Sequence, residues 1–217
     1  MNTTQRNTSS TITLTGNPDL IDPGFASPPL NPFVLFKQWL CDADRLQVPE
    51  PRALILSTIN PAGAPSSRVV LMKSVDETGV TFGTSSFSQK VKDMDENPFV
   101  AGTLWWQKTM QQINFKGTVA KMDAPVSDEM FLQRTREAQA VAALSRQSNT
   151  LINESDLHFQ IEQLIASNNP IKRPETWHAY HIAITSIGFW HGSQNRFHKR
   201  LCYDLMVRNW TRQFLQP

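Results

Sequence analysis

The sequence is poor in cysteine and has no long apolar run. Its two cysteines, Cys41 and Cys202, show no CxxC or Cys/His spacing. We therefore expect two free thiols in a reducing compartment and no metal site. No apolar run approaches the ~20 residues that a membrane-spanning helix needs, and no cationic and apolar leader opens the chain. These absences predict a cytoplasmic protein that contacts no membrane.

An excess of charge of one sign is also missing. The 21 Lys and Arg residues nearly balance the 19 Asp and Glu residues, which gives a net charge of +2. Such an even balance argues against nucleic acid as a partner. The chain carries no GxGxxG, P-loop, GxSxG or HExxH motif, and its five histidines lack metal-ligand spacing. If the protein is an enzyme, we expect a cofactor to supply the chemistry.

What is present predicts one mainly β domain with helices. Residues 1–18 are rich in Ser, Thr and Asn and predict a disordered tail, and residues 19–217 form the domain. Helices are predicted at 32–46, at 127–147 and at 155–167. A further short helix is predicted after the serines at 85–88 and ends at about residue 96. Short strands are predicted at 53–59, 68–73, 80–84, 99–106, 110–122, 177–185, 187–192, 198–207 and 210–215. Short strands with hairpin-length links favour an antiparallel barrel or sandwich.

A predicted hairpin in the first half of the chain gathers cations and hydroxyls. Arg68 and Lys73 lie on a strand expected to be largely buried. A turn at 76–79, with a positive φ expected at Gly79, leads into the return strand. The serines that follow are placed to cap a helix that carries Lys90. These groups suit an anion, most simply a phosphate. An ordinary surface hairpin with solvated charges is the alternative.

A second polar cluster, Arg196, His198 and Arg200, lies in a predicted loop between two strands. The three residues alternate, so on an extended segment they share one face. Loops on a rigid scaffold often carry ligand contacts, and a cation there can bind a phosphate or a carboxylate. A basic hairpin tip exposed to water is the alternative.

Two further features can face a ligand. Gln112 lies in a strand fit for burial, where an unpaired amide costs ~1–3 kcal/mol. Either a ligand edge or neighbouring backbone would satisfy it. On the long predicted helix, Met130, Arg134, Ala138 and Val141 form one row, in which Arg134 is the only charge. Arg134 points either into a pocket or to the surface.

Seven motifs occur in a specific order and spacing. They are RVVLMK (68–73), FGTSSFSQK (82–90), QQINFKG (111–117), SRQS (145–148), FWHG (189–192), RFHKR (196–200) and the terminal LQP. Together they resemble the pyridoxine/pyridoxamine phosphate oxidase family of flavoenzymes, over about residues 20–217. The resemblance implies a split β-barrel with flanking helices and a homodimer that binds FMN at its interface.

The resemblance also implies which residues bind FMN, several of them from the partner subunit. Gln89 occupies a position that is usually arginine in the vitamin oxidases. The implied set is Arg68, Val69, Val70, Leu71, Met72, Lys73, Gly83, Thr84, Ser88, Gln89, Lys90, Gln112, Gln147, Ser148, Trp190 and Arg200.

The substrate side departs from the vitamin oxidases. The implied substrate-binding residues are Lys73, Met130, Arg134, Ala138, Arg196 and His198. Met130 and Ala138 stand where the vitamin oxidases have a tyrosine and a serine. The loss of two hydroxyls disfavours a small phosphorylated pyridine and favours a larger, flatter acid. With the stretches PRALILSTI, QQI, SRQSxTL and LQP, these losses resemble the phenazine-biosynthesis branch of the family.

The resemblance therefore implies an FMN-dependent oxidase that aromatises partly reduced phenazine carboxylic acids. Electrons would pass from substrate to flavin and then to O2, giving peroxide. No residue of the chain is assigned as a catalytic acid or base. Two alternatives stay open. One is a pyridoxine/pyridoxamine 5'-phosphate oxidase, and the other is a non-catalytic flavin- or haem-binding split-barrel protein.

Overall fold

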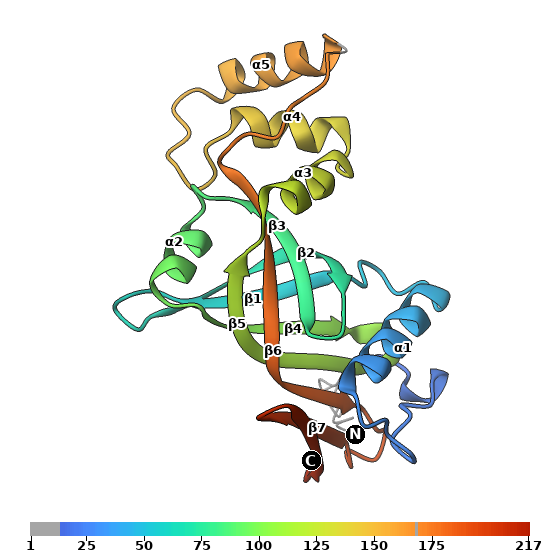
Figure 1. Ribbon diagram of the computed structural model, residues 1–217. Coiled ribbons are helices and arrows are strands. Elements are labelled where there is room, and N and C mark those ends of the chain that lie inside the picture. The colour runs from blue at the N-terminus through green and yellow to red at the C-terminus, as the bar shows by residue number, and fades with distance from the viewer. Residues whose placement is uncertain (1–13, 168) are drawn as a thin grey trace, which may run out of the picture.

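The computed structural model describes residues 14–167 and 169–217, which form a β-barrel with helices around it (Figure 1). The helices are α1 (Pro32–Arg45), α2 (Gln89–Glu96), α3 (Ala124–Leu132), α4 (Arg136–Leu144) and α5 (Glu154–Ala166), with short 3-10 turns η1 (Pro18–Leu20) and η2 (Gln107–Thr109). The strands are β1 (Ala53–Ile59), β2 (Pro65–Val75), β3 (Gly79–Ser85), β4 (Phe99–Trp106), β5 (Gln111–Lys121), β6 (Trp177–His191), β7 (Lys199–Met206) and β8 (Asn209–Leu215).

Six antiparallel strands close the barrel. Their order is β3-β2-β1-β4-β5-β6, and β6 pairs back onto β3. The strands β7 and β8 extend the sheet beyond β6. The predicted mainly β fold with a barrel is therefore confirmed. No helix in the described part of the chain is long and apolar enough to cross a membrane.

The strand β6 joins the two halves of the sheet. Its first half pairs with β3 and its second half with β7, while β5 runs along most of its length. The prediction of two strands here, at 177–185 and 187–192, is wrong. A register shift between Lys116 and Gly117 of the partner strand marks the irregularity, and the chain continues through it as one strand.

The helix α1 packs against the barrel core. Its start is as predicted, because Asn31 caps it by accepting from the N–H of Phe33, and Pro32 follows at the first position. Phe36 and Trp39 are fully buried in the same cluster as the barrel side chains. The ring of Trp39 packs edge-on against Phe189 of β6, with the ring centroids 5.2 Å apart.

The helices α3, α4 and α5 form a separate layer beyond the start of β6, seen at the top of Figure 1. A second small core, which includes Phe131 and Trp177, holds this layer to the strand. The predicted continuous helix at 127–147 is wrong. Thr135 breaks it, because its side chain accepts from the N–H of Ala138 and starts α4 anew. Gln139 stabilises the break by donating to the carbonyl oxygens of residues 131, 132 and 134.

The turn between β2 and β3 is closed by Asp76, whose Oδ1 accepts from the N–H groups of Thr78 and Gly79. The positive φ expected at Gly79 is wrong, because this residue is not among the described residues with a positive φ. Glycine is needed there for space. A Cβ at Gly79 would overlap the carbonyl oxygen of Ile182 on β6.

Two other predictions need correction. The strand β2 is not largely buried: Met72 is 1 % exposed, but Val69 and Leu71 are 64 % and 51 % exposed. Its outer face is uncovered in one protomer, and the apolar composition alone does not show this. Of the predicted disordered tail, residues 1–13 lie outside the described residues. Residues 14–18 pack on the body, where Asn17 N–H donates to the carbonyl of Lys108 at 3.0 Å.

Candidate functional site

A pocket of about 480 Å3 is lined by residues of β2, β3, α2 and α4. Of the residues that the sequence predicted for flavin or substrate, it gathers Arg68, Val69, Val70, Leu71, Gly83, Thr84, Lys90, Arg134 and Gln147. Met72, next along β2, is instead buried in the barrel core. The hairpin and the helical layer, which are distant in sequence, therefore meet in one cavity.

Two cations, Lys90 and Arg68, make one part of this pocket positive. Lys90 is buried and donates from Nζ to Thr84 Oγ1 at 3.0 Å. Thr84 donates in turn to Gln147 Oε1 at 3.2 Å. The chain thus presents two charged donors to the same cavity, an arrangement suited to an anion, while the one proton of the Thr84 hydroxyl is given to Gln147.

Burial makes the charge on Lys90 costly. Burial, together with the charge of Arg68, lowers the pKa of Lys90 from its usual 10.5 to about 8. Burial also lowers the pKa of Arg68, against the opposing effect of Asp93. An anion bound between the two side chains would favour the charged form of both.

Ser88 precedes α2 with a buried hydroxyl that, within the described residues, has no hydrogen-bond partner. The predicted capping of α2 by this hydroxyl is therefore wrong. Its neighbour Gln89 donates its backbone N–H to Ser148 Oγ at 3.2 Å. A buried unpaired hydroxyl beside a helix N-terminus and Lys90 fits an oxygen of a phosphate. The residues present therefore fit the phosphate of FMN.

A buried carboxylate, Asp93 of α2, lies close to Arg68. It accepts from Thr58 Oγ1 at 2.6 Å and from Gln89 Nε2 at 2.9 Å, and its Oδ2 lies 3.8 Å from Arg68 Nη2. No sequence pattern predicts this contact. Thr58 and Arg68 precede Asp93 by many residues, so no local spacing links them.

Arg134 is a half-buried cation that has no acidic partner among the described residues. Its Nη2 donates to the carbonyl of Ala138 at 3.0 Å, and its Nε is buried without a partner. Its guanidinium carbon lies 5.2 Å from the ring centre of Trp177, a residue that the sequence did not mark as functional. Burial lowers the pKa of Arg134. A carboxylate in the pocket would supply the missing partner.

The residues predicted beside Arg134 have different surroundings. Met130 is buried in the same small core as Trp177, and Ala138 is half-buried on α4. Lys73 is half-buried at a pairing irregularity of β2 and does not line the pocket. Gly83 makes room for Trp177, because a Cβ there would overlap the indole ring.

The remaining predicted flavin residues, Gln112, Trp190 and Arg200, form with His198 a group that is called the second cluster below. Trp190 on β6 is paired with Gln112 on β5 and with Arg200 on β7, so the three form a row across the sheet. The ring of His198 lies 4.7 Å from that of Trp190. None of these residues lines the pocket that holds Arg68. In one protomer, the two clusters do not make one site.

Two details of this cluster differ from the prediction. Arg196 does not share an extended face with His198 and Arg200, because it has a φ of 68° in a turn closed by its N–H and the carbonyl of Ser193. Gln112 is half-buried. The fully buried amide is that of Gln111, whose side-chain atoms have no partner within the described residues.

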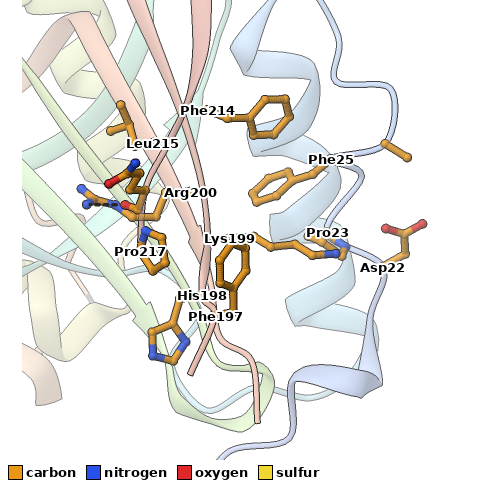
Figure 2. Close-up of a pocket in the computed structure, with 12 residues that line it drawn as sticks. Asp22, Pro23, Phe25, Phe197, His198, Lys199, Arg200, Phe214, Leu215 and Pro217 are labelled. Carbon is orange, nitrogen blue, oxygen red and sulfur yellow. Dashed lines mark hydrogen bonds between the residues drawn. The ribbon is translucent and has the colours of Figure 1, made fainter. Parts of the chain in front are cut away.

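A second pocket, of about 900 Å3, lies where the start of β7, the chain end and the segment before α1 meet. Figure 2 shows Lys199 and Phe25 on one side of the β7 strand and His198 and Arg200 on the other. Arg200 donates to the carbonyl of Gln216 at 3.3 Å. His198 and Arg200 of the second cluster therefore border an open cavity at the end of the molecule opposite α3–α5.

Comparison with known proteins places the chain among flavoenzymes. Residues 42–168 match the family described as pyridoxamine 5'-phosphate oxidase. Residues 177–217 match the pyridoxine 5'-phosphate oxidase C-terminal dimerisation region, which indicates a dimer. The second cluster lies partly in that region.

Relatives of two activities are similar to the chain. It is 35 % identical to the dihydrophenazinedicarboxylate synthase of Pseudomonas chlororaphis, covering 94 % of this chain and 92 % of that protein. It is 36 % identical to the pyridoxine/pyridoxamine 5'-phosphate oxidase of Mycolicibacterium paratuberculosis, covering 86 % and 84 %. The crystal structure of PhzG from Burkholderia lata 383 in complex with tetrahydrophenazine-1-carboxylic acid is similar, with a TM-score of 0.90, 33 % identity and coverage of 93 % and 100 %.

Proposed function

Because the chain belongs to the pyridoxamine 5'-phosphate oxidase family, we propose that it is an FMN-dependent oxidase that aromatises partly reduced phenazine carboxylic acids, with O2 as the electron acceptor. Identity alone does not choose between the two activities, since both kinds of relative are about equally similar. The observation that carries the proposal is the position of Arg134 over Trp177, without an acidic partner among the described residues, in a pocket that is also lined by Arg68 and Lys90.

The chain's own residues bind and orient the cofactor. Arg68 and Lys90, which line the pocket, would hold the phosphate together with the buried hydroxyl of Ser88, which has no partner among the described residues. Thr84 and Gln147 would bond further along the flavin. FMN, when bound, supplies the chemistry by accepting two electrons from the substrate and passing them to O2. The protein therefore contributes position and charge instead of an acid or base of its own.

The substrate side favours a flat acid. Arg134 offers a carboxylate a charge-assisted bond, and the indole of Trp177 below it is apolar. Met130 and Ala138 bring no hydroxyl to a phosphate. This composition fits a tricyclic carboxylic acid better than a phosphorylated pyridine.

The second cluster completes the site in the proposed homodimer. Trp190, Arg200 and Gln112 do not line the pocket of their own protomer, so we infer that they reach the flavin held by the partner subunit. His198 and Arg196 would reach the substrate in the same way. This accounts for a binding set that one protomer does not bring together.

Turnover of two substrates tests the activity. The FMN-loaded protein is given either a tetrahydrophenazine carboxylic acid or pyridoxine 5'-phosphate under the same conditions, with O2 consumption and product absorbance as readouts. We expect oxidation of the phenazine to be much the faster. Efficient vitamin oxidation without phenazine oxidation would assign the chain to the other branch, which the 36 % identity to a vitamin oxidase makes the second candidate.

Binding of the cofactor is tested by Arg68→Ala. Loss of a charge-assisted bond is worth ~1.5–3 kcal/mol, so FMN affinity should fall by about tenfold or more while the circular dichroism spectrum stays unchanged. Arg208→Ala, at an exposed position, is the control. Unchanged FMN affinity in Arg68→Ala would remove the phosphate site from this pocket. A purified protein without a flavin band after FMN addition would favour a non-flavin role.

A further inference from the structure

The carboxylate of Asp93 lies behind the positive part of the pocket and not in it. Asp93 is 1 % exposed and does not line the cavity, whereas Arg68 does. Its Oδ2 is nevertheless only 3.8 Å from Arg68 Nη2. A buried anion beside a phosphate site weakens the attraction for phosphate. A buried carboxylate at this position therefore needs a function that offsets the weaker attraction for phosphate.

Two hydroxyls connect this carboxylate to Arg68. Thr58 Oγ1 lies 2.6 Å from Asp93 Oδ2 and 2.8 Å from Arg68 Nη1, and Ser66 Oγ lies 3.4 Å and 2.6 Å from Asp93 Oδ2 and Arg68 Nη2. A hydroxyl has one proton, and an ionised carboxylate only accepts. Each hydroxyl must therefore donate to Asp93 and turn its lone pairs toward Arg68.

The ionised form of Asp93 is supported by its surroundings. Burial raises the pKa of Asp93, but hydrogen bonds from Thr58 and Gln89 and the charge of Arg68 outweigh burial and lower it overall. Gln89 Nε2 donates to Asp93 Oδ1 at 2.9 Å, so this amide group supports the carboxylate. The guanidinium of Arg68 is also fixed by the carbonyl of Leu56, at 3.3 Å.

We propose that Asp93 is a positioning residue for the FMN phosphate, which acts by fixing the polarity of Thr58 and Ser66 so that they hold Arg68 at the pocket. The proposal rests on the proposed FMN site. It assigns a role in cofactor selectivity to a residue that touches neither cofactor nor substrate. It also accounts for Gln89, whose side chain serves Asp93.

Asp93→Asn tests this role, because the amide has the same shape but can donate to Thr58 and reverse the hydroxyl. The full chain is loaded with FMN or with riboflavin, which lacks the phosphate, and flavin release on dilution is followed by fluorescence. We expect the Kd for FMN to rise about tenfold, the loss of one charge-assisted bond, and that for riboflavin to change less than about twofold. Asp95→Asn, at an exposed acid on the same helix, should change neither.

Thr58→Val gives a second, independent arm. It removes the connecting hydroxyl without changing charge, and we expect the same selective loss for FMN. The double variant should lose little more than either single variant, because both changes break the same connection. If Asp93→Asn does not fold, the ratio of the Kd for FMN to the Kd for riboflavin in Thr58→Val alone tests the proposal.

Three outcomes would overturn the role of Asp93. Tighter FMN binding by Asp93→Asn would show that the carboxylate only repels phosphate. Equal losses for FMN and riboflavin would show a general structural role. Fully additive losses in the double variant would separate Thr58 from Asp93. By contrast, a wild-type protein that binds riboflavin as tightly as FMN would refute the phosphate site, and with it the proposed function.

Discussion

Lys90 lies in the proposed phosphate site and has a pKa of about 8, so FMN binding should depend on pH. The protonated form binds the phosphate, and the bound phosphate raises the pKa of Lys90. Binding therefore takes up a proton above about pH 8, and FMN affinity should fall by up to about tenfold per pH unit there. Measurement of the Kd for FMN between about pH 7 and pH 9.5 checks this.

The same lysine predicts the opposite trend for the stability of the flavin-free chain. Between a folded pKa of about 8 and the usual 10.5, the unfolded chain binds more protons than the folded chain. The free energy of unfolding should therefore rise with pH across that window.

For the pH dependence of FMN binding, riboflavin, which lacks a phosphate, serves as the control and should show no loss of affinity from the deprotonation of Lys90. A flat FMN affinity up to about pH 9.5 would contradict the placement of Lys90.

Arg134 is the residue on which substrate choice is predicted to depend. Arg134→Gln removes the cation but keeps a donor, and it should raise the KM for a carboxylated substrate about tenfold to a hundredfold. FMN affinity should stay the same, because Arg68 and Lys90, and not Arg134, are the proposed phosphate cations. Steady-state kinetics and flavin titration separate the two effects. A loss of FMN binding with an unchanged KM would place Arg134 on the cofactor instead.

At the scale of elements, the break between α3 and α4 sets the position of Arg134. The two N–H groups of Gln139 Nε2 are shared among three carbonyl oxygens there, at 3.2 to 3.3 Å. Gln139→Glu has the same shape but places a carboxylate against them. It should cost about 1–3 kcal/mol in the free energy of unfolding and also raise the substrate KM.

Chemical denaturation measures this cost. Gln133→Glu, at the exposed C-cap of α3, is the matched control and should cost less than about 1 kcal/mol. Equal costs in the two variants would show that the three bonds of Gln139 do not hold the break.

Local chemistry explains which elements the sequence could predict. The start of α1 depends on Asn31 and Pro32, which are adjacent, and the β2–β3 turn depends on Asp76 within three residues. The break at Thr135 was missed, because the surrounding residues favour a helix and its support from Gln139 is tertiary. Whether the apolar face of β2 is covered depends on other elements and is not encoded in that strand.

The residues of the candidate site likewise divide into those that local sequence patterns predict and those that depend on contacts between distant segments. Arg68 and Lys90 belong to recognisable motifs and Arg134 to a row on a predicted helix, and the structure brings the three into one pocket. Asp93 and Trp177 were missed, since their contacts with Arg68 and Arg134 join segments far apart in the chain. Sequence patterns report such residues only as ordinary helix or strand positions.

At the scale of the whole molecule, the two clusters predict complementation between variants that weaken flavin binding. Arg68→Ala damages the pocket cluster and Arg200→Ala damages the row on β6 and β7. If each flavin site takes one cluster from each subunit, a mixed dimer has one site with both changes and one intact site.

An equal mixture, refolded or coexpressed so that subunits exchange at random, should therefore recover about a quarter of the wild-type flavin sites. FMN content per chain at a concentration that saturates only intact sites is the measurement. Arg68→Ala mixed with Lys90→Ala is the matched control. Both changes affect the same cluster, so a mixed dimer of these two has no intact site. No recovery in the Arg68/Arg200 mixture would show that one protomer builds its own site. Recovery in the control would show that Arg68 and Lys90 do not serve the same site.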